Sequence, residues 1–373
     1  MIWRVLWESH QRLCEGMLKY SLGVDCLSAS VRERQDTGKF GERRIMIFDS
    51  ESVFEENVIT VLKQNGWKDG VLRYPTERDL LDNWKGILYR NNKDIDRHGK
   101  YPLTDGEMTQ IIEQIETLRT PLALNSFVNG RTVSITRDNK EDVAHFGKEV
   151  SLYIYDRKEI AGGKSTYQIA QQPVYPAKNK MLNSRRGDLV LLINGMPLIH
   201  IELKKSGIPV SQATNQIEKY AHEGVFTGLF RLVQIFVAMN PDDAVYFANP
   251  GVDKFNPSYY FHWADYNNEP ICGGQNPGKD EWKLFIGGTS GTAGLLSIPM
   301  AHQLIGFYTI ADSADGCLKV LRSYQYIAAN AISDVVRKCD WEQRPATPGR
   351  PGGYVWHTTG SGKTMTSFKS AQL

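Results

Sequence analysis

The chain has 373 residues, of which 41% are hydrophobic and 23% are charged, and its formal net charge at pH 7 is +2. This composition is typical of a globular protein, and because no apolar run approaches the roughly 20 residues that span a bilayer, we expect no membrane span. The scattered cysteines, with no C-x-x-C pair, argue against a disulfide framework and against structural zinc. With a nearly neutral charge, any binding of nucleic acid has to come from local patches.

The N-terminal residues 1–45 differ from the rest of the chain. They have no convincing apolar period and no secretory cleavage site. We therefore expect an N-terminal extension over residues 1–45 and a cytoplasmic location for the protein.

Helices are predicted first and a mixed sheet after them. Residues 50–66 place Phe54, Val58 and Leu62 on one stripe behind a serine cap, which predicts an amphipathic helix that closes at a glycine. Residues 106–118 predict a second helix. Short β-rich runs then predict the strands of the sheet: YQIAQQPVY, DLVLLI, LIHIEL and VQIFVAM.

Changes in composition divide the chain further. We expect one domain over residues 46–245, followed by a connecting segment over 246–300 that is rich in Asn, Pro, Gly and Asp. Residues 301–373 are expected to begin a second domain. Within it, residues 318–338 predict a helix, and YVW at 354–356 predicts a strand that runs into a phosphate-binding loop.

Two charged residues interrupt the apolar run LIHIEL. Glu202 and Lys204 are two positions apart on the predicted strand, so their side chains project from the same face. Burying charged groups in such a strand is costly unless they have partners. The pattern therefore indicates a functional site, although a surface ion pair at a strand end is the alternative.

Asp188 begins the preceding strand, and the register of the hairpin decides whether it can join Glu202. A strict two-residue Asn-Gly turn sets Asp188 opposite Ile201, on the wrong face of the sheet. A three-residue loop that includes Met196 shifts the register by one position and sets Asp188 opposite Glu202. We therefore expect that longer loop, or a β-bulge.

Two neighbouring carboxylates repel each other unless a divalent cation lies between them, and hard oxygen ligands with open water positions suit Mg²⁺. Such an ion can hold a scissile phosphate, while a nearby lysine positions or activates the attacking water. The pattern predicts Mg²⁺-dependent hydrolysis of phosphodiesters, with Asp188 and Glu202 as metal ligands and Lys204 as a catalytic residue.

A further pair lies on the next predicted helix. Gln216 and Tyr220 are one turn apart and can lean toward the same site, although such pairs are also common on helix surfaces. Taken together, G-D before an apolar strand, I-E-L-K-K in the next strand and Q-x-x-x-Y on the following helix resemble the RecB-like nuclease domain of Type I restriction enzyme motor subunits. The resemblance implies a mixed-sheet α/β fold of the PD-(D/E)xK class, metal binding by Asp188 and Glu202, and catalysis by Lys204 with support from Gln216 and Tyr220.

The same resemblance implies other ligands and partners. It implies an acidic metal ligand on an early helix, for which Glu55 is the candidate, and service to the helix dipole is the alternative. It implies double-stranded DNA as substrate, and methylation and specificity subunits as partners. A basic stretch before Asp188 is either close enough to contact DNA phosphates or merely solvated: Lys178, Lys180, Arg185 and Arg186.

Near the C-terminus, the chain fits the phosphate-loop pattern G-x-G-K-T. In such a loop, backbone N–H groups face phosphates, Lys363 reaches the β- and γ-phosphates, and Thr364 binds Mg²⁺. His357 in place of the first glycine favours a helicase-like translocase of superfamily 2 over a kinase. Gln325 resembles the glutamine that reads adenine in such motors, and an exposed helix position is the alternative. The predicted ATP-binding residues are Gln325, Thr359, Gly360, Ser361, Gly362, Lys363 and Thr364.

No acidic Walker B strand follows the loop before Leu373. We therefore expect the truncated start of a RecA-like parallel α/β motor domain, in which ATP-driven translocation belongs to the full-length protein and ATPase activity of this chain alone is not expected. The leading hypothesis is the nuclease-bearing N-terminal part of a Type I restriction motor subunit. Two alternatives stay open: a nuclease–helicase fusion of DNA repair, and a non-catalytic remnant that only docks onto partner subunits.

Overall fold

The computed structural model describes residues 48–94, 100–160, 162–176, 185–276, 279–338 and 354–373. All of them belong to one compact unit, Ile45–Leu373. The expected extension over 1–45 and the basic residues Lys178 and Lys180 lie outside the described residues. Among the helices that are described, none combines the length and the apolar character needed to cross a bilayer.

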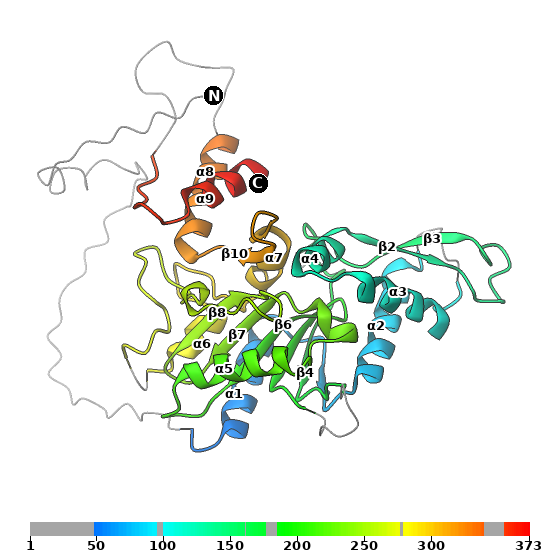
Figure 1. The fold of residues 1–373 in the computed structure, drawn as a ribbon, viewed down its shortest axis with the longest axis horizontal. Helices are drawn as coiled ribbons and strands as arrows, with labels where there is room; N and C mark the ends of the chain where they lie inside the picture. The colour runs from blue at the N-terminus through cyan, green and yellow to red at the C-terminus, as the bar shows by residue number, and fades with distance from the viewer. Residues whose placement is uncertain (1–47, 95–99, 161, 177–184, 277–278, 339–353) are drawn as a thin grey trace, which may run out of the picture. The chain divides into compact units, whose positions relative to one another are not determined.

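A six-stranded mixed sheet lies at the centre of this unit (Figure 1). Its order is β1-β4-β5-β6-β7-β8; β1 runs parallel to β4 and β6 parallel to β7, and the other neighbours are antiparallel. The four predicted strands are confirmed as β4 to β7. The strands are β1 (Val71–Arg73), β4 (Tyr167–Gln171), β5 (Leu189–Ile193), β6 (Met196–Leu203), β7 (Ile235–Met239) and β8 (Ala244–Ala248).

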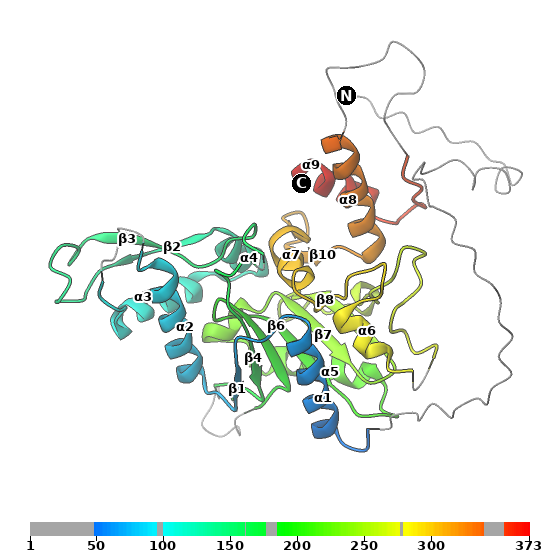
Figure 2. The ribbon, with the colours of Figure 1, turned by 180° about the vertical axis from the view of Figure 1, so that it is seen from behind.

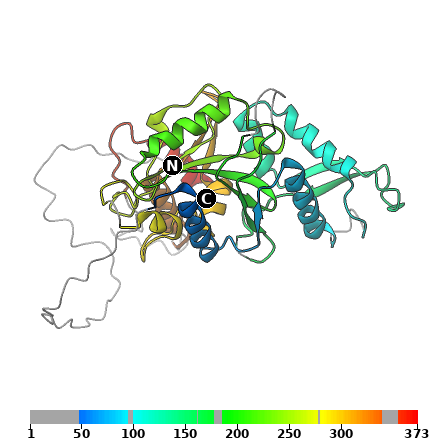
Figure 3. The ribbon, with the colours of Figure 1, turned by 90° about the horizontal axis from the view of Figure 1, so that it is seen from below.

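Helices cover both faces of the sheet, so every residue of β4 to β8 is buried. Helix α5 (Val210–His222) makes the crossover between the parallel strands β6 and β7 and packs on one face, over Phe236 and Ala238. Helices α1 (Glu51–Gln64) and α6 (Glu281–Gly287) lie on the other face (Figures 2 and 3). Burial on both faces explains why these strands are nearly continuous apolar runs.

The two predicted N-terminal helices are confirmed, with their caps. Ser50 accepts the N–H of Val53 at the start of α1. Helix α3 (Asp105–Thr117) begins with a capping box between Thr104 and Glu107, which satisfies two N–H groups that the helix itself leaves open. Helix α3 packs on β2 (Thr132–Thr136), which pairs antiparallel with β3 (Glu149–Tyr153), and α2 (Glu77–Asn92) packs on β3. Helix α4 (Pro121–Asn129) follows α3 in the chain.

A buried ion network joins α3 to this β2–β3 pair. The guanidinium of Arg137 lies 2.7 Å from the carboxylate of Glu107 and 2.9 Å from that of Asp142, and the side chains of Arg137 and Glu107 are fully buried. A second N–H group of Arg137 donates to the carbonyl of Tyr101. Each buried charge therefore has a partner of opposite charge, which is the condition for burying it.

The C-terminal part differs from two predictions. The helix expected over 318–338 begins only at Ser323, because residues 317–320 pair antiparallel with 309–312. YVW at 354–356 forms no strand with the described residues, and Tyr354 and Trp356 are largely exposed. The elements here are α7 (Met300–Phe307), β9 (Thr309–Asp312), β10 (Cys317–Val320), α8 (Ser323–Lys338) and α9 (Lys363–Gln372).

The predicted domain division stays a prediction, although its edges can be placed in the fold. The boundary at residue 245 falls within β8. The segment 246–300 carries the short helix η2 (Pro257–Tyr259) as well as α6, and it buries Trp263 and Trp282. Apolar side chains of this segment are thus part of the core of the unit.

The β5–β6 hairpin turns at Asn194 and Gly195, whose φ angles are +52° and +84°. Ile193 pairs directly with Met196, so the predicted three-residue loop is wrong. The alternative, a β-bulge, is confirmed, because the register shifts at Leu198, which has no partner on β5. Two positive φ angles suit a two-residue turn that continues the twist of the strands.

Gly195 also lets the turn approach helix α2. A Cβ atom added at Gly195 would lie 2.9 Å from the Cα of Trp84, whereas one added at Gly207, where φ is +80°, would meet nothing within 4 Å. We expect Gly195→Ala to lower the free energy of unfolding by about 2–4 kcal/mol, since backbone strain and displacement of α2 add. Gly207→Ala should cost about 1 kcal/mol, from strain alone. Urea denaturation monitored by tryptophan fluorescence measures both, and equal losses would contradict the close packing of the turn.

Candidate active site

The bulge brings two carboxylates together at one end of the sheet. Beyond the bulge, Leu189 pairs with Ile201, so Asp188, one residue before β5, lies beside Glu202 on β6. The backbone N–H of Leu203 donates to Oδ2 of Asp188 over 2.7 Å. Asp188 and Glu202 therefore lie side by side as predicted, and the bulge, not a longer loop, sets this register.

The electrostatic environment of this pair is unfavourable to ionisation. Glu202 is fully buried, and neither of its carboxylate oxygens has a hydrogen-bond partner among the described residues. Burial raises the pKa of Glu202 to about 8. Burial, and after it the charge of Glu202, raise the pKa of Asp188 well above its ordinary range. The two carboxylates therefore repel each other in an environment of low dielectric constant. The surrounding protein provides little positive charge to offset this repulsion.

Lys204 is the cation nearest to the pair. Its Nζ lies 3.6 Å from Oε1 of Glu202 and 3.6 Å from Oε1 of Glu51, and it donates to the carbonyl of Leu203. Glu51 belongs to the first turn of α1 and is half exposed. Sequence reasoning missed Glu51, because its proximity to Lys204 comes from packing between distant segments.

A buried histidine lies on the other side of Glu202. His200 Nε2 is 3.3 Å from Oε2 of Glu202, and His200 Nδ1 is 2.8 Å from the hydroxyl of Tyr175. Burial lowers the pKa of His200 to about 4, so the ring is neutral. If Tyr175 donates to Nδ1, Nε2 carries the hydrogen and faces the carboxylate, which is the favourable tautomer beside a negative charge. Sequence reasoning missed His200, although its place two residues before Glu202 puts it on the same face of β6.

Glu55 lies near the pair without joining it. The side-chain amides of Gln171 and Gln172 donate to its carboxylate, and burial raises its pKa. Its charge in turn contributes to the raised pKa of Asp188. Within the described chain, no group of three or more His, Cys, Asp or Glu side chains is close enough to hold a metal ion, so the carboxylates meet as a pair.

Gln216 and Tyr220 on α5 support the segment that leads into Asp188. The amide of Gln216 donates to the hydroxyl of Tyr220 over 2.7 Å, and this hydroxyl donates to the carbonyl of Arg186 over 2.9 Å. The two side chains are therefore brought to the site, and they hold the backbone two residues before Asp188. They also line a shallow pocket of about 340 Å³ with Arg185, Gln212, Asn215 and Lys219.

Of the two described residues of the basic stretch, Arg185 forms an ion pair and Arg186 does not. Arg185 forms a two-pronged ion pair with Glu223, with both N–O distances at 2.8 Å. Arg186 is exposed, and its guanidinium lies 5.8 Å from the ring centroid of Tyr74. Arg186 thus keeps its charge at the surface, two residues before Asp188.

The phosphate-loop residues lie just before and at the start of α9, away from the sheet. Gly360 and Gly362 have φ angles of +79° and +78°, which glycine adopts without strain. Lys363 donates to the carbonyl of Thr358, and the amide of Gln325 donates to the carbonyl of Ser361. Gln325 therefore binds the loop itself here, and adenine reading stays a prediction.

Comparison with known proteins identifies the family of the chain. A profile of the Type I restriction enzyme R protein N-terminus family matches residues 49–255, which include the carboxylate pair and Lys204. The chain belongs to this family. A profile of the SWI2/SNF2 ATPase family matches residues 324–373, which include Gln325 and the phosphate loop.

Relatives of this R protein region are named as endonuclease subunits. The Type I restriction enzyme SsaAORF53P endonuclease subunit of Staphylococcus saprophyticus is 31% identical over 336 residues, which cover 88% of this chain and 30% of the relative. The SauMSSORF170P subunit of Staphylococcus aureus is 31% identical over 330 residues, with the same coverage. The EcoprrI subunit of Escherichia coli is 29% identical over 217 residues, 57% of this chain and 62% of the relative. The chain thus spans about 30% of the length of the staphylococcal relatives.

Two fully buried glutamates of this R protein region, Glu202 and Glu107, should respond in opposite ways to neutralisation. Glu202→Gln removes a poorly balanced buried charge, so in metal-free buffer we expect it to raise the free energy of unfolding by about 1–2 kcal/mol. Glu107→Gln removes one of the carboxylates that pair with the buried Arg137, and it should lower the free energy of unfolding by about 3–5 kcal/mol. Urea denaturation measures both variants, and a similar loss in each would show that the charge of Glu202 is already compensated.

Proposed function

We propose that this chain is the nuclease-bearing N-terminal part of a Type I restriction R subunit, and that Asp188, Glu202 and Lys204 hydrolyse double-stranded DNA with Mg²⁺. The observation that carries this proposal is the pair of a buried carboxylate, Glu202, and a partly buried one, Asp188, for which Lys204 is the nearest cation among the described residues. The mixed sheet, buried on both faces, supports assignment to the PD-(D/E)xK class. Membership of the R protein family favours restriction over a DNA-repair fusion.

The residues present fit a magnesium ion. Mg²⁺ is usually bound through one or two carboxylates together with water and substrate phosphates, which agrees with a pair and not a larger cluster. The unpartnered oxygens of Glu202 and the free side of Asp188 would be its ligands, and Glu55 is a further candidate. When bound, the ion supplies a Lewis acid that polarises the scissile phosphate and lowers the pKa of a water molecule.

The chain's own residues position the other participants. The ammonium of Lys204, held by the carbonyl of Leu203, points toward Glu202 and can orient the attacking water or stabilise charge on the phosphate. His200 lies behind the Glu202 carboxylate, with its Nε2 3.3 Å from Oε2 of Glu202, and limits the space open to that side chain. Gln216 and Tyr220 hold the backbone at Arg186, whose exposed guanidinium can contact a flanking phosphate.

The remaining assignments concern the whole R subunit. The phosphate loop and Gln325 would bind ATP at the start of a RecA-like translocase, since α9 presents its N-terminus at the loop. The endonuclease subunits to which the chain is similar are named for Type I restriction enzymes. We propose methylation and specificity subunits as partners, with the cytoplasm as the compartment.

Binding of Mg²⁺ can be tested without any partner. We expect 10 mM MgCl₂ to raise the melting temperature of the wild-type chain by about 3–6 °C, since a ligand that binds only the folded state stabilises it. Asp188→Asn and Glu202→Gln should each remove this rise, whereas Asp334→Asn, at an exposed position on α8, should keep it. Differential scanning fluorimetry measures the shift against NaCl of equal ionic strength. A rise that survives in both site variants would place the ion elsewhere.

Cleavage tests the role of Lys204. Its neighbour Lys205 is exposed and provides a matched control. We expect Lys204→Ala to slow Mg²⁺-dependent nicking of a supercoiled plasmid by about 10²–10⁴-fold, as for loss of a group that assists proton transfer. Lys205→Ala should stay near the wild-type rate. Equal losses in the two variants would count against catalysis by Lys204, and a wild-type chain that binds Mg²⁺ but cleaves nothing would favour the docking remnant.

A further inference from the structure

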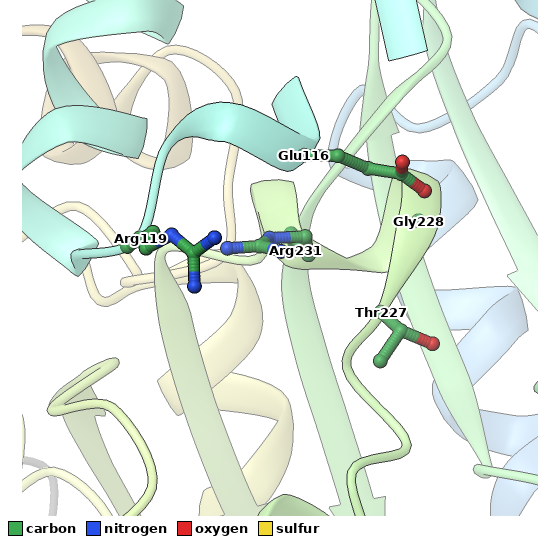
Figure 4. Close-up of a pocket in the computed structure, with 5 residues that line it drawn as sticks. All are labelled: Glu116, Arg119, Thr227, Gly228 and Arg231. Atoms are coloured by element: carbon green, nitrogen blue, oxygen red, sulfur yellow. The ribbon is translucent and has the colours of Figure 1, made fainter. Parts of the chain in front are cut away.

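A second polar pocket lies beside helix η1 (Gly228–Leu232), outside the carboxylate site. It has a volume of about 590 Å³ and lies between the C-terminal end of α3 and the start of η1 (Figure 4). Its lining residues are Glu116, Arg119, Thr227, Gly228 and Arg231. The proposed cleavage chemistry uses none of them.

Two arginines dominate the charge of this pocket. Arg119 and Arg231 point toward each other in Figure 4, whereas Glu116 extends over Gly228. Arg231 donates to the carbonyl of Leu118, the residue that ends α3, and is thereby held in place. Arg119 forms no ion pair or hydrogen bond with the residues that the structure describes. Two guanidinium groups that face each other repel unless an anion lies between them.

The chemistry of the pair indicates the anion. A guanidinium group presents several N–H donors in one plane, which matches the oxygen atoms of a phosphate better than a lysine ammonium does. Both groups border a shallow, open pocket, where they can reach a phosphate that is part of a larger molecule. Arg231 is already oriented by its bond to α3, so less side-chain freedom is lost when the anion binds.

Helix η1 links this pocket to the carboxylate pair. Its Phe230 ring packs against Tyr175 with centroids 4.6 Å apart, and the Tyr175 hydroxyl bonds to His200. The backbone N–H of Leu229 in η1 donates to the carboxylate of Glu77. Three residues before Glu77, the ring of Tyr74 contacts the guanidinium of Arg186. A continuous series of packed side chains therefore connects the pocket to the carboxylate pair.

We propose that Arg119 and Arg231 bind a backbone phosphate of the DNA duplex away from the scissile bond. The inference rests on the proposed function, namely that this chain acts on DNA. Free inorganic phosphate presents the same oxygen atoms, but an open pocket leaves room for a phosphate that is part of a longer backbone. A contact of this kind fixes the duplex without reading its sequence.

The test compares single-arginine variants in DNA binding. Fluorescence anisotropy with a labelled 30-base-pair duplex in EDTA, over a series of NaCl concentrations, measures affinity and its salt dependence without cleavage. We expect Arg119→Ala to weaken binding by about 3–10-fold and to reduce the slope of log K against log salt by about 1, for duplexes of any sequence. Arg78→Ala, which removes an exposed arginine paired with Asp82 and Asp105, should bind as the wild type does.

A second measurement distinguishes free inorganic phosphate from a phosphate of the DNA backbone. Sodium phosphate is titrated into the wild type and Arg119→Ala while the melting temperature is recorded. If phosphate stabilises only the wild type and DNA affinity is the same in both, the pocket takes a free anion and the DNA proposal is overturned. Unchanged affinity and unchanged salt slope in Arg119→Ala overturn it as well. Since binding is measured in EDTA, a chain that binds DNA but never cleaves it would contradict the proposed function and leave this inference standing.

Discussion

The site depends on one electrostatic constraint, the placing of a partly buried carboxylate, Asp188, beside a fully buried one, Glu202, in a sheet whose faces are both covered. Desolvation is the largest cause of the raised pKa of Asp188 and of Glu202. The same chain buries Glu107 against the guanidinium of Arg137, so it has the means to balance a buried acid where stability is the purpose. At Glu202 it places a neutral histidine and one lysine instead. That difference supports the proposal that a cation binds at this pair.

Much of this arrangement was predictable because local rules and the fold agree. The apolar runs of β4 to β7 and the Asn-Gly turn correctly predicted the hairpin and its neighbours. The pairing of Asp188 with Glu202 was predicted by requiring that both side chains lie on the same face of the hairpin. The choice between a longer loop and a bulge was beyond sequence reasoning, because both shift the register by one residue. Tight packing of the turn against Trp84 explains why the shorter turn occurs.

Other features come from contacts between distant segments and have no local signal. Tyr175 reaches His200, and Gln171 and Gln172 reach Glu55, from parts of the chain that local periodicity does not connect. The helix expected from residue 318 was too long because LKV suits a strand as well as a helix, and pairing with β9 decides. YVW has strand propensity, but a strand also needs a neighbour to accept its hydrogen bonds.

Because of the bulge at Leu198, six residues separate the turn from Glu202 on β6, whereas five separate it from Asp188 on β5. Side chains alternate strictly along a strand, so the chemistry of this hairpin depends on a count as well as on residue types. Its apolar positions can exchange one aliphatic side chain for another at small cost. A change of length by one residue between the turn and Glu202 would instead exchange the two faces and turn the carboxylate toward the opposite layer. The hairpin should therefore tolerate apolar substitutions but not single insertions. This property depends on the number of residues between the turn and Glu202, which amino-acid composition does not reveal.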